Sequence, residues 1–216
     1  MFQLDKITQK NKKIANCQAG MNYVELIVVL SIFSLLSSVV LFNYGGFQAK
    51  VDIKNLGSDI ALKIIEAQKS SLSGQWPPLA QQGQISSTWK PSYGIYFNPN
   101  SDNKSFIYFT DLDQNGSLLN PSCFSGSECL DKITITKNNY IERIDECGTP
   151  DCSPLNGRIT DPLSITFKRP DSRALFHLNN VPLNLTGSKY VQITIRSPKE
   201  MTALIKIYSS GRVQVN

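Results

Sequence analysis

Apolar and polar positions divide the chain into an N-terminal part with the pattern of helix and a longer part with the pattern of strands. Residues 26–42 carry no charge, and the apolar character extends back to Tyr23. About 20 helical residues are enough to cross the hydrocarbon core of a bilayer. Residues 21–43 are therefore predicted to form a membrane-spanning helix.

The pattern becomes amphipathic after this span. Apolar residues recur at steps of mostly three and four between residues 47 and 71, which is typical of a helix with one buried face. Gly45-Gly46 predicts a local interruption, because glycine costs up to about 1 kcal/mol in a helix interior. Ser73-Gly74, followed by tryptophan and two prolines, ends the pattern. Residues 44–74 are thus predicted to be an amphipathic helix that leads into a globular domain.

The remainder, residues 75–216, consists of short alternating runs that are typical of half-buried strands. Connections rich in Asn, Pro, Asp, Ser and Gly separate these runs, as turns require. The predicted strands are 93–97, 105–109, 132–136, 164–167, 174–178, 190–195, 203–208 and 212–215. One long helix followed by such strands predicts an α+β fold, with antiparallel sheet packed against the helix.

One carboxylate, Glu25, interrupts the apolar part near its start. A charge within a bilayer costs about 2 to 4 kcal/mol, so ionisable residues there are usually functional. The preceding residues form a leader with four lysines, which predicts that the N-terminus stays in the cytoplasm. A secretory signal would carry a small-residue cleavage site after the apolar run, and residues 43–47 contain none.

The basic leader, Gly20, the apolar run and Glu25 together resemble the processing signal of type IV pilins and type II secretion pseudopilins. The resemblance implies that a prepilin peptidase removes residues 1–20 and that the new N-terminus, Met21, is methylated. It also implies that Glu25 meets the Met21 amine of a neighbouring subunit, so that each buried charge has a partner. An uncleaved single-pass anchor, with Glu25 near the headgroups, is the alternative.

Segments farther along the chain follow the order of the GspH/FimT group of minor pseudopilins, which they resemble. These segments are 65–70, 93–97, 109–116, 165–170 and 210–213. Residues 121–156 look like a cysteine-containing insertion without a counterpart in that group. The resemblance implies a filament subunit rather than an enzyme, belonging either to a type II secretion pseudopilus or to a type IV pilus.

The same resemblance implies the partners and the location. The partners would be other pilins or pseudopilins, the prepilin peptidase, an assembly platform with its ATPase, and the membrane. The subunit would first sit in the inner or cytoplasmic membrane with a cytoplasmic N-terminus. It would then enter an extracytoplasmic filament in the periplasm or at the cell surface.

Four of the five cysteines, Cys123, Cys129, Cys147 and Cys152, lie beyond the predicted span. An even number of cysteines in an oxidising location favours two disulfides. Four cysteines allow three pairings, of which nearest-neighbour closure is one. Zinc is the alternative, but zinc sites usually need cysteine pairs closer together than these.

Asp111, Asp113 and Asn115 begin a D-x-D-x-N-G run, the start of a calcium-binding loop. The bidentate glutamate of an EF-hand would fall at Ser122, so the run lacks its strongest ligand. The run is therefore interpreted as a polar turn in which Asp and Asn bond their own backbone, with calcium binding as the alternative. No cofactor is expected apart from that alternative.

The charge distribution suggests a further partner. The net charge of +5 falls to about +2 without the leader, which is too little to indicate nucleic acid by total charge. Residues 158–216 nevertheless hold nine basic and three acidic residues. The resemblance to FimT-like proteins of DNA uptake makes Arg196, Lys206 and Arg212 candidates for DNA contact, with solvated strand faces as the alternative.

The sequence offers no catalytic constellation. His177 is the only histidine and lies within a predicted strand. No nucleophile elbow, phosphate-binding glycine loop or metal-binding histidine pair occurs. The chain is therefore expected not to be an enzyme.

Overall fold

The computed structural model describes residues 22–118, 120–148, 151–154, 161–185 and 189–216. The chain divides into two compact units, Met1–Tyr44 and Gly45–Asn216. The helix α1 (Tyr23–Leu72) belongs to both units, and all strands belong to the second, here called the β-rich unit. Leader residues 1–20, with the predicted cleavage site at Gly20, and Met21 lie outside the described residues.

The predicted interruption of the helix at Gly45-Gly46 is wrong. The helix α1 runs through both glycines as one 50-residue element. Regular helix on both sides outweighs the cost of two glycines, because each further residue of an existing helix adds a hydrogen bond without a new nucleus. The helix ends at Leu72, and Gly74 then turns the chain with a φ of +73°, a value that favours glycine.

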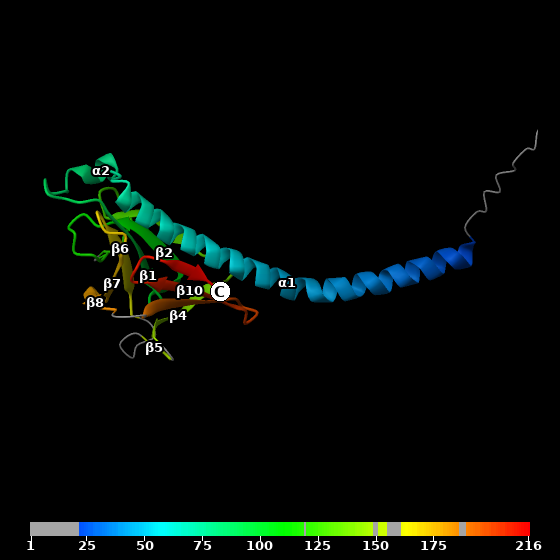
Figure 1. The fold of residues 1–216 in the computed structure, drawn as a ribbon. Helices are drawn as coiled ribbons and strands as arrows, with labels where there is room; N and C mark the ends of the chain where they lie inside the picture. Colours follow the sequence, from blue (N-terminus) through cyan, green and yellow to red (C-terminus); the bar gives the residue numbers. More distant parts are fainter. Residues whose placement is uncertain (1–21, 119, 149–150, 155–160, 186–188) are drawn as a thin grey trace, which may run out of the picture. The chain divides into compact units, whose positions relative to one another are not determined.

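From Gly45 onward, α1 is amphipathic as predicted. Figure 1 shows this part of α1 lying along the strands. Its residues Ile53, Ile60, Ile64 and Ala67 are almost fully buried, and they share one core cluster with residues of both sheets. Burying a large apolar side chain contributes about 1.5–3 kcal/mol, so this face fixes the helix on the sheets.

Six antiparallel strands form the first sheet, in the order β3-β2-β1-β6-β7-β8. Its strands are β1 (Ser92–Asn98), β2 (Asp102–Thr110), β3 (Cys129–Thr134), β6 (Leu163–Lys168), β7 (Ala174–Leu178) and β8 (Val181–Leu183). At Gly94 a side chain would collide with the Ile165 carbonyl oxygen, the Thr166 methyl group and the Phe109 ring. Glycine therefore permits the close contact of β1 with its neighbours.

Five antiparallel strands form the second sheet, in the order β11-β10-β9-β4-β5. Its strands are β4 (Tyr140–Cys147), β5 (Cys152–Pro154), β9 (Tyr190–Arg196), β10 (Thr202–Tyr208) and β11 (Val213–Val215). The sequence predicted strands at β9, β10 and β11 but missed β4, β5, β8 and the short helix α2 (Leu79–Gln82). A bulge between Ile141 and Arg143 explains the miss at β4, because it breaks the two-residue alternation.

The core of the β-rich unit joins three layers of apolar side chains, one from α1 and one from each sheet. Ile95 and Phe167 of the first sheet are completely buried, as are Ile193 and Ile205 of the second. The predicted α+β fold, a long N-terminal helix with antiparallel sheet, is thereby confirmed.

Candidate functional site

The described part of the N-terminal unit is an apolar helix surface that no other described residue buries. It lies in α1, which contains an 18-residue window with a mean hydropathy of 2.5 and no buried residue. Phe42 is 86% exposed and Tyr23 is 75% exposed. By length and composition this helix can cross a membrane, and a signal sequence near the N-terminus would meet the same criteria.

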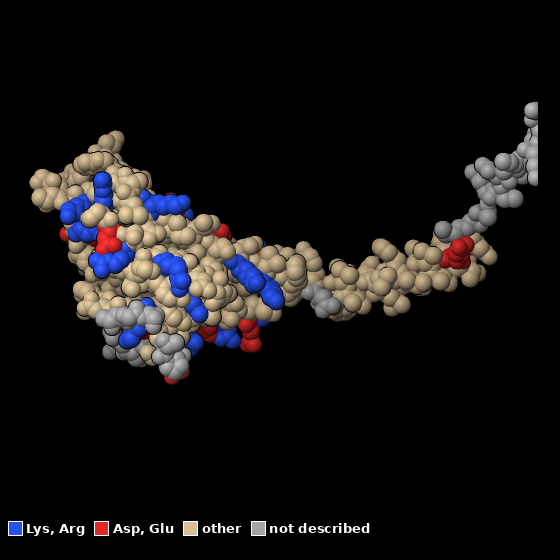
Figure 2. All heavy atoms as spheres, viewed as in Figure 1, with Lys and Arg blue, Asp and Glu red and all other residues tan. Residues whose placement is uncertain are grey.

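Glu25 stands in the first turn of α1 and is the single charged residue among residues 22–44. Figure 2 shows the visible face of this part as uncharged apart from that acidic side chain. Within the described chain, no lysine or arginine forms an ion pair with Glu25. The unbonded N–H groups of a helix start favour a negative charge there. The predicted partner, the Met21 amine, lies outside the described residues.

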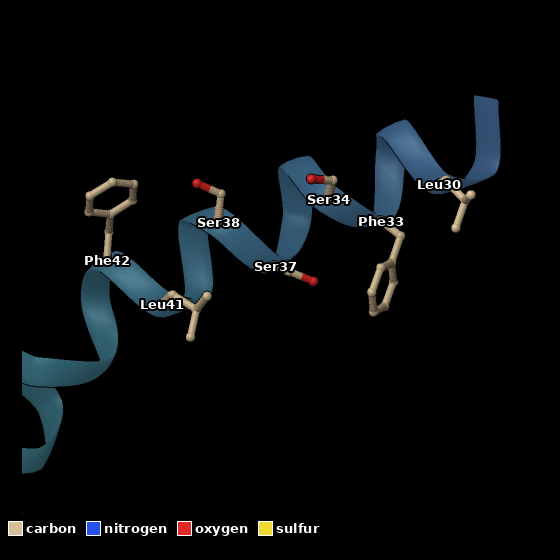
Figure 3. A pocket seen from close by; sticks show the side chains of 7 residues that line it. All are labelled: Leu30, Phe33, Ser34, Ser37, Ser38, Leu41 and Phe42. Carbon is tan, nitrogen blue, oxygen red and sulfur yellow. The ribbon is translucent and has the colours of Figure 1, made fainter. Parts of the chain in front are cut away.

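Serines and large apolar residues together line a shallow groove on this helix. The lining residues are Leu30, Phe33, Ser34, Ser37, Ser38, Leu41 and Phe42. In Figure 3 the hydroxyls of Ser34 and Ser38 point to one side of the helix, and the Phe33 and Leu41 side chains point to the other. Small side chains let a second helix approach closely in an apolar environment, so the groove suits helix–helix contact.

A second candidate site lies in the β-rich unit, where the structure brings Asp111 and Asp113 together with Glu128. One oxygen from each carboxylate lies within 4.8 Å of the other two. The predicted third ligand, Asn115, is engaged in the local turn, because its Nδ2 donates to Asp113 at 2.6 Å and its Oδ1 accepts from the Ser117 N–H at 2.7 Å. The sequence missed Glu128.

The three carboxylates differ in environment. Asp111 is buried, Glu128 is partly buried and Asp113 is exposed. Burial, with a smaller effect of the nearby Asp113 charge, raises the pKa of Asp111 to about 6. Burial likewise raises the pKa of Glu128 to about 7, and the charges of Asp113 and Asp111 add to the effect. Both shifts follow mainly from the removal of the carboxylates from water, and the nearby acidic charges add a smaller contribution.

The predicted DNA-contact residues do not form one group. Arg196 forms ion pairs with Glu142 and Glu200, and its contact with Glu142 raises its pKa. Lys206 and Arg212 instead lie over tyrosine rings. Lys206 Nζ is 5.2 Å from the Tyr190 ring centroid, and Arg212 Cζ is 3.9 Å from that of Tyr208.

The two tyrosine rings connect these cations. The rings of Tyr190 and Tyr208 are 5.1 Å apart on the paired strands β9 and β10. Lys206, Arg212 and the two tyrosines are called the cation–tyrosine cluster below. Figure 2 shows lysine and arginine side chains spread over the visible face of the β-rich unit.

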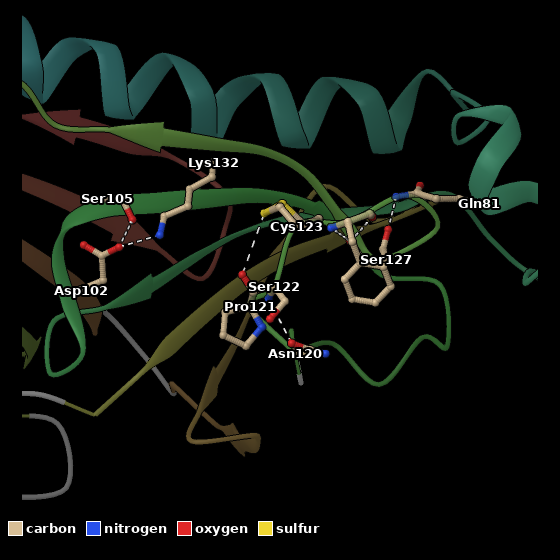
Figure 4. The surroundings of a disulfide bond; sticks show 11 residues. Gln81, Asp102, Ser105, Asn120, Pro121, Ser122, Cys123, Ser127 and Lys132 are labelled. Carbon is tan, nitrogen blue, oxygen red and sulfur yellow. Dashed lines mark hydrogen bonds and ion pairs between the residues drawn. A yellow bond between two sulfur atoms is a disulfide. The ribbon is translucent and has the colours of Figure 1, made fainter.

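Both disulfides are present, with the nearest-neighbour pairing that was one of the three possibilities. Cys123 bonds Cys129, and Cys147 bonds Cys152. The second disulfide joins directly opposite residues of β4 and β5. Figure 4 shows the surroundings of the first, where the Gln81 side chain donates a hydrogen bond to the Ser127 carbonyl. All four cysteines are thus occupied, which leaves none for zinc.

His177 lies on β7 and is buried, and burial lowers its pKa. Its ring packs so closely on Gly116 that any side chain there would collide with it. Gly116 also has a φ of +82°, a region in which glycine is favoured. The histidine therefore fits a structural role, holding the turn after Asp113 against β7.

The architecture of a 50-residue N-terminal helix with an apolar first part, packed through its second part on antiparallel sheets, is pilin-like. Comparison with models of known protein families, with curated proteins and with solved structures finds no match to this chain.

Proposed function

We propose that the protein is a minor pilin or pseudopilin, which is cleaved by a prepilin peptidase and assembled into a filament through α1. The uncovered apolar part of α1, joined to a folded β-rich unit, is the observation that carries the proposal. Lipid would cover this part before assembly, and the helices of neighbouring subunits would cover it afterwards. The filament would be a type II secretion pseudopilus or a type IV pilus.

Glu25 is the assembly residue in this proposal. Cleavage after Gly20 creates a positive amine at Met21, close in sequence to the carboxylate. Inside an apolar filament core each charge is costly without a partner, so the Met21 amine of one subunit would pair with Glu25 of another. That pairing would fix the axial position of the incoming subunit, which would be delivered by an assembly platform and its ATPase.

The β-rich unit would lie on the extracytoplasmic side and make lateral contacts. Its two disulfides support this location, because such bonds persist in oxidising compartments. The N-terminus of the precursor would remain in the cytoplasm, as the lysines of the leader favour. In this role the chain acts by binding other subunits and not as an enzyme.

The test is the intact mass and N-terminal sequence of the chain recovered from membranes of cells that also express a prepilin peptidase. The expected product starts at Met21 and carries an added methyl group. Gly20→Val should leave the precursor uncut, whereas Gln9→Ala in the leader should be cut normally. A wild-type chain that still starts at Met1 beside an active peptidase would refute the proposal and favour a plain anchor.

DNA contact within an uptake pilus is a second candidate, and the cation–tyrosine cluster favours it. Cations neutralise phosphates, and tyrosine rings offer faces for bases. Binding of labelled single-stranded DNA to the full chain in detergent should weaken with salt and weaken further in Arg212→Gln. Arg173→Gln is the control, because Arg173 is an exposed arginine paired with Asp171. Equal binding by both variants would remove this candidate.

A further inference from the structure

We propose that Asp111, Asp113 and Glu128 form a calcium site that the Cys123–Cys129 disulfide helps to organise. The inference is independent of the filament role, because all of these residues belong to the β-rich unit. The sequence contains the start of a calcium loop but has Ser122 where the glutamate ligand of such a loop would stand. In the fold, the carboxylate of Glu128, six residues later, would take the place of that ligand.

The side chain of Asp111 gives an independent indication of a ligand. It is only 1% exposed, and its Oδ1 atom has neither solvent contact nor a hydrogen-bond partner. Its Oδ2 atom accepts hydrogen bonds from Ser92 Oγ at 2.9 Å and from the Gly116 N–H at 3.2 Å. A buried carboxylate oxygen without a partner is costly, and a bound cation would provide that partner.

The carboxylates of the cluster have no basic partner in the described part of the chain, where no ion pair includes Asp111, Asp113 or Glu128. Three acidic groups therefore share a small volume without a positive charge. A divalent cation would offset their mutual repulsion and the cost of burying them.

Strand pairing holds two of the ligands in place. Asp111 directly follows β2 and Glu128 directly precedes β3, and these strands are paired. The Thr110 N–H donates to the Glu128 carbonyl at 2.9 Å, and the Leu112 N–H donates to Glu128 Oε1 at 3.0 Å. The Trp89 indole N–H donates to the Asp111 carbonyl at 2.9 Å. The ligands therefore stand on restrained backbone.

The disulfide adds a restraint on the side of Glu128. Glu128 is the residue before Cys129, inside the loop that the Cys123–Cys129 bond closes. On its other side, Ser127 is buried and its carbonyl accepts a hydrogen bond from Gln81. A ligand held in its bound position loses less entropy on binding. Reduction of this disulfide should therefore weaken cation binding.

The ligand chemistry favours Ca²⁺. Carboxylates are hard oxygen ligands, which suit Ca²⁺ and Mg²⁺ better than softer metals. Ca²⁺–oxygen distances of about 2.3–2.6 Å place opposite ligands about 4.6–5.2 Å apart, whereas Mg²⁺ needs about 4.0–4.2 Å. Oxygens that lie within 4.8 Å of one another can share one Ca²⁺. Water can complete the shell on the side of the exposed Asp113.

Terbium luminescence tests the site on the full chain in a non-ionic detergent. Tb³⁺ occupies calcium sites. Trp89 is one of two tryptophans in the chain, and its indole donates a hydrogen bond to the Asp111 carbonyl, so it is close enough to sensitise the emission of Tb³⁺ bound at this site. We expect saturable emission that Ca²⁺ displaces at lower concentration than Mg²⁺. Asp113→Asn and Glu128→Gln should each weaken binding at least about tenfold, because affinity depends on the number of charged ligands.

Asp131→Asn is the matched control, because Asp131 is an exposed aspartate on β3 outside the cluster. It should bind like the wild type. A second measurement covers folding: Ca²⁺ should raise the Tm of the wild type and of Asp131→Asn, but not that of Asp113→Asn. Emission that is absent, or equal in all variants, would overturn the site. Equal displacement by Mg²⁺ would overturn the assignment to calcium, and unchanged affinity after reduction would overturn the role of the disulfide.

Discussion

The parts of α1 before and after Gly45 are one helix with two different surfaces. Before Gly45 the helix is mostly apolar and carries no charge except Glu25, and no residue of its 18-residue apolar window is buried in the described structure. After Gly45 one face is buried against the sheets, and the opposite face carries charges such as Lys54 and Asp59. The second part thus packs within the chain, whereas lipid and other subunits are the partners proposed for the first part.

The largest effect is expected on filament incorporation when Glu25, in the first part of α1, is substituted. Glu25→Ala should leave membrane insertion and cleavage intact but reduce incorporation into filaments by roughly a hundredfold or more, because breaking a buried ion pair costs about 3–5 kcal/mol. The measurement is the amount of subunit in sheared filaments relative to the membrane fraction. Glu66→Ala, which removes an exposed helix carboxylate paired with Lys63, should incorporate normally. Normal incorporation of Glu25→Ala would contradict the assembly role.

A smaller effect is expected on the stability of the β-rich unit, and it should differ between substitutions in the two parts of α1. Ile64→Ala removes a completely buried side chain from the core and should lower the free energy of unfolding of the β-rich unit by about 2–5 kcal/mol. Leu36→Ala, at a position that is 64% exposed, should change it by less than about 0.5 kcal/mol. Denaturant unfolding followed by tryptophan fluorescence measures both. Similar losses in the two variants would mean that the first part also packs on the folded unit.

The smallest effect concerns the junction between the parts. A methyl group at Gly46 would meet no atom within 4 Å, so Gly46→Ala should stabilise the helix by about 0.5–1 kcal/mol. Amide hydrogen exchange of residues 44–50 measures this local change. At Gly45 the new methyl group would collide with Lys199 Nζ, which donates to the Gly45 carbonyl at 2.7 Å, so the gain there should be smaller. Faster exchange in Gly46→Ala would show that this glycine is needed for the helix.

Local pattern predicted most of the fold. The strands β1, β6, β7, β9 and β10 came from simple alternation, and Leu72 ends α1 close to the predicted position. The predictions failed where the pairing of strands or the length of an element outweighed local sequence preferences. The bulge at Ile141 hid β4, and the length of regular helix around Gly45-Gly46 outweighed the low propensity of glycine.

The candidate sites were predictable only as far as their residues are near in sequence. Asp111 and Asp113 belong to one motif, but Glu128 reaches them through the pairing of β2 with β3. Arg196 was grouped with Lys206 by charge and by the resemblance to FimT-like proteins. Its ion pair with Glu142, 54 residues away, depends on the pairing of β4 with β9. Glu25 could be recognised from the sequence because the apolar residues around it are its neighbours in the chain.

The continuity of α1 through Gly45-Gly46 has a mechanical consequence. In the proposed filament, a subunit held by its N-terminal part would bear tension along α1, and the turn with the lowest helical propensity would open first. Each residue that opens lengthens from about 1.5 Å to about 3.3–3.6 Å. Ile53 is the first residue of α1 that is almost fully buried, so the contacts with the sheets begin after the glycine pair. In the proposed filament, the glycine pair would lengthen under load before the folded unit is strained.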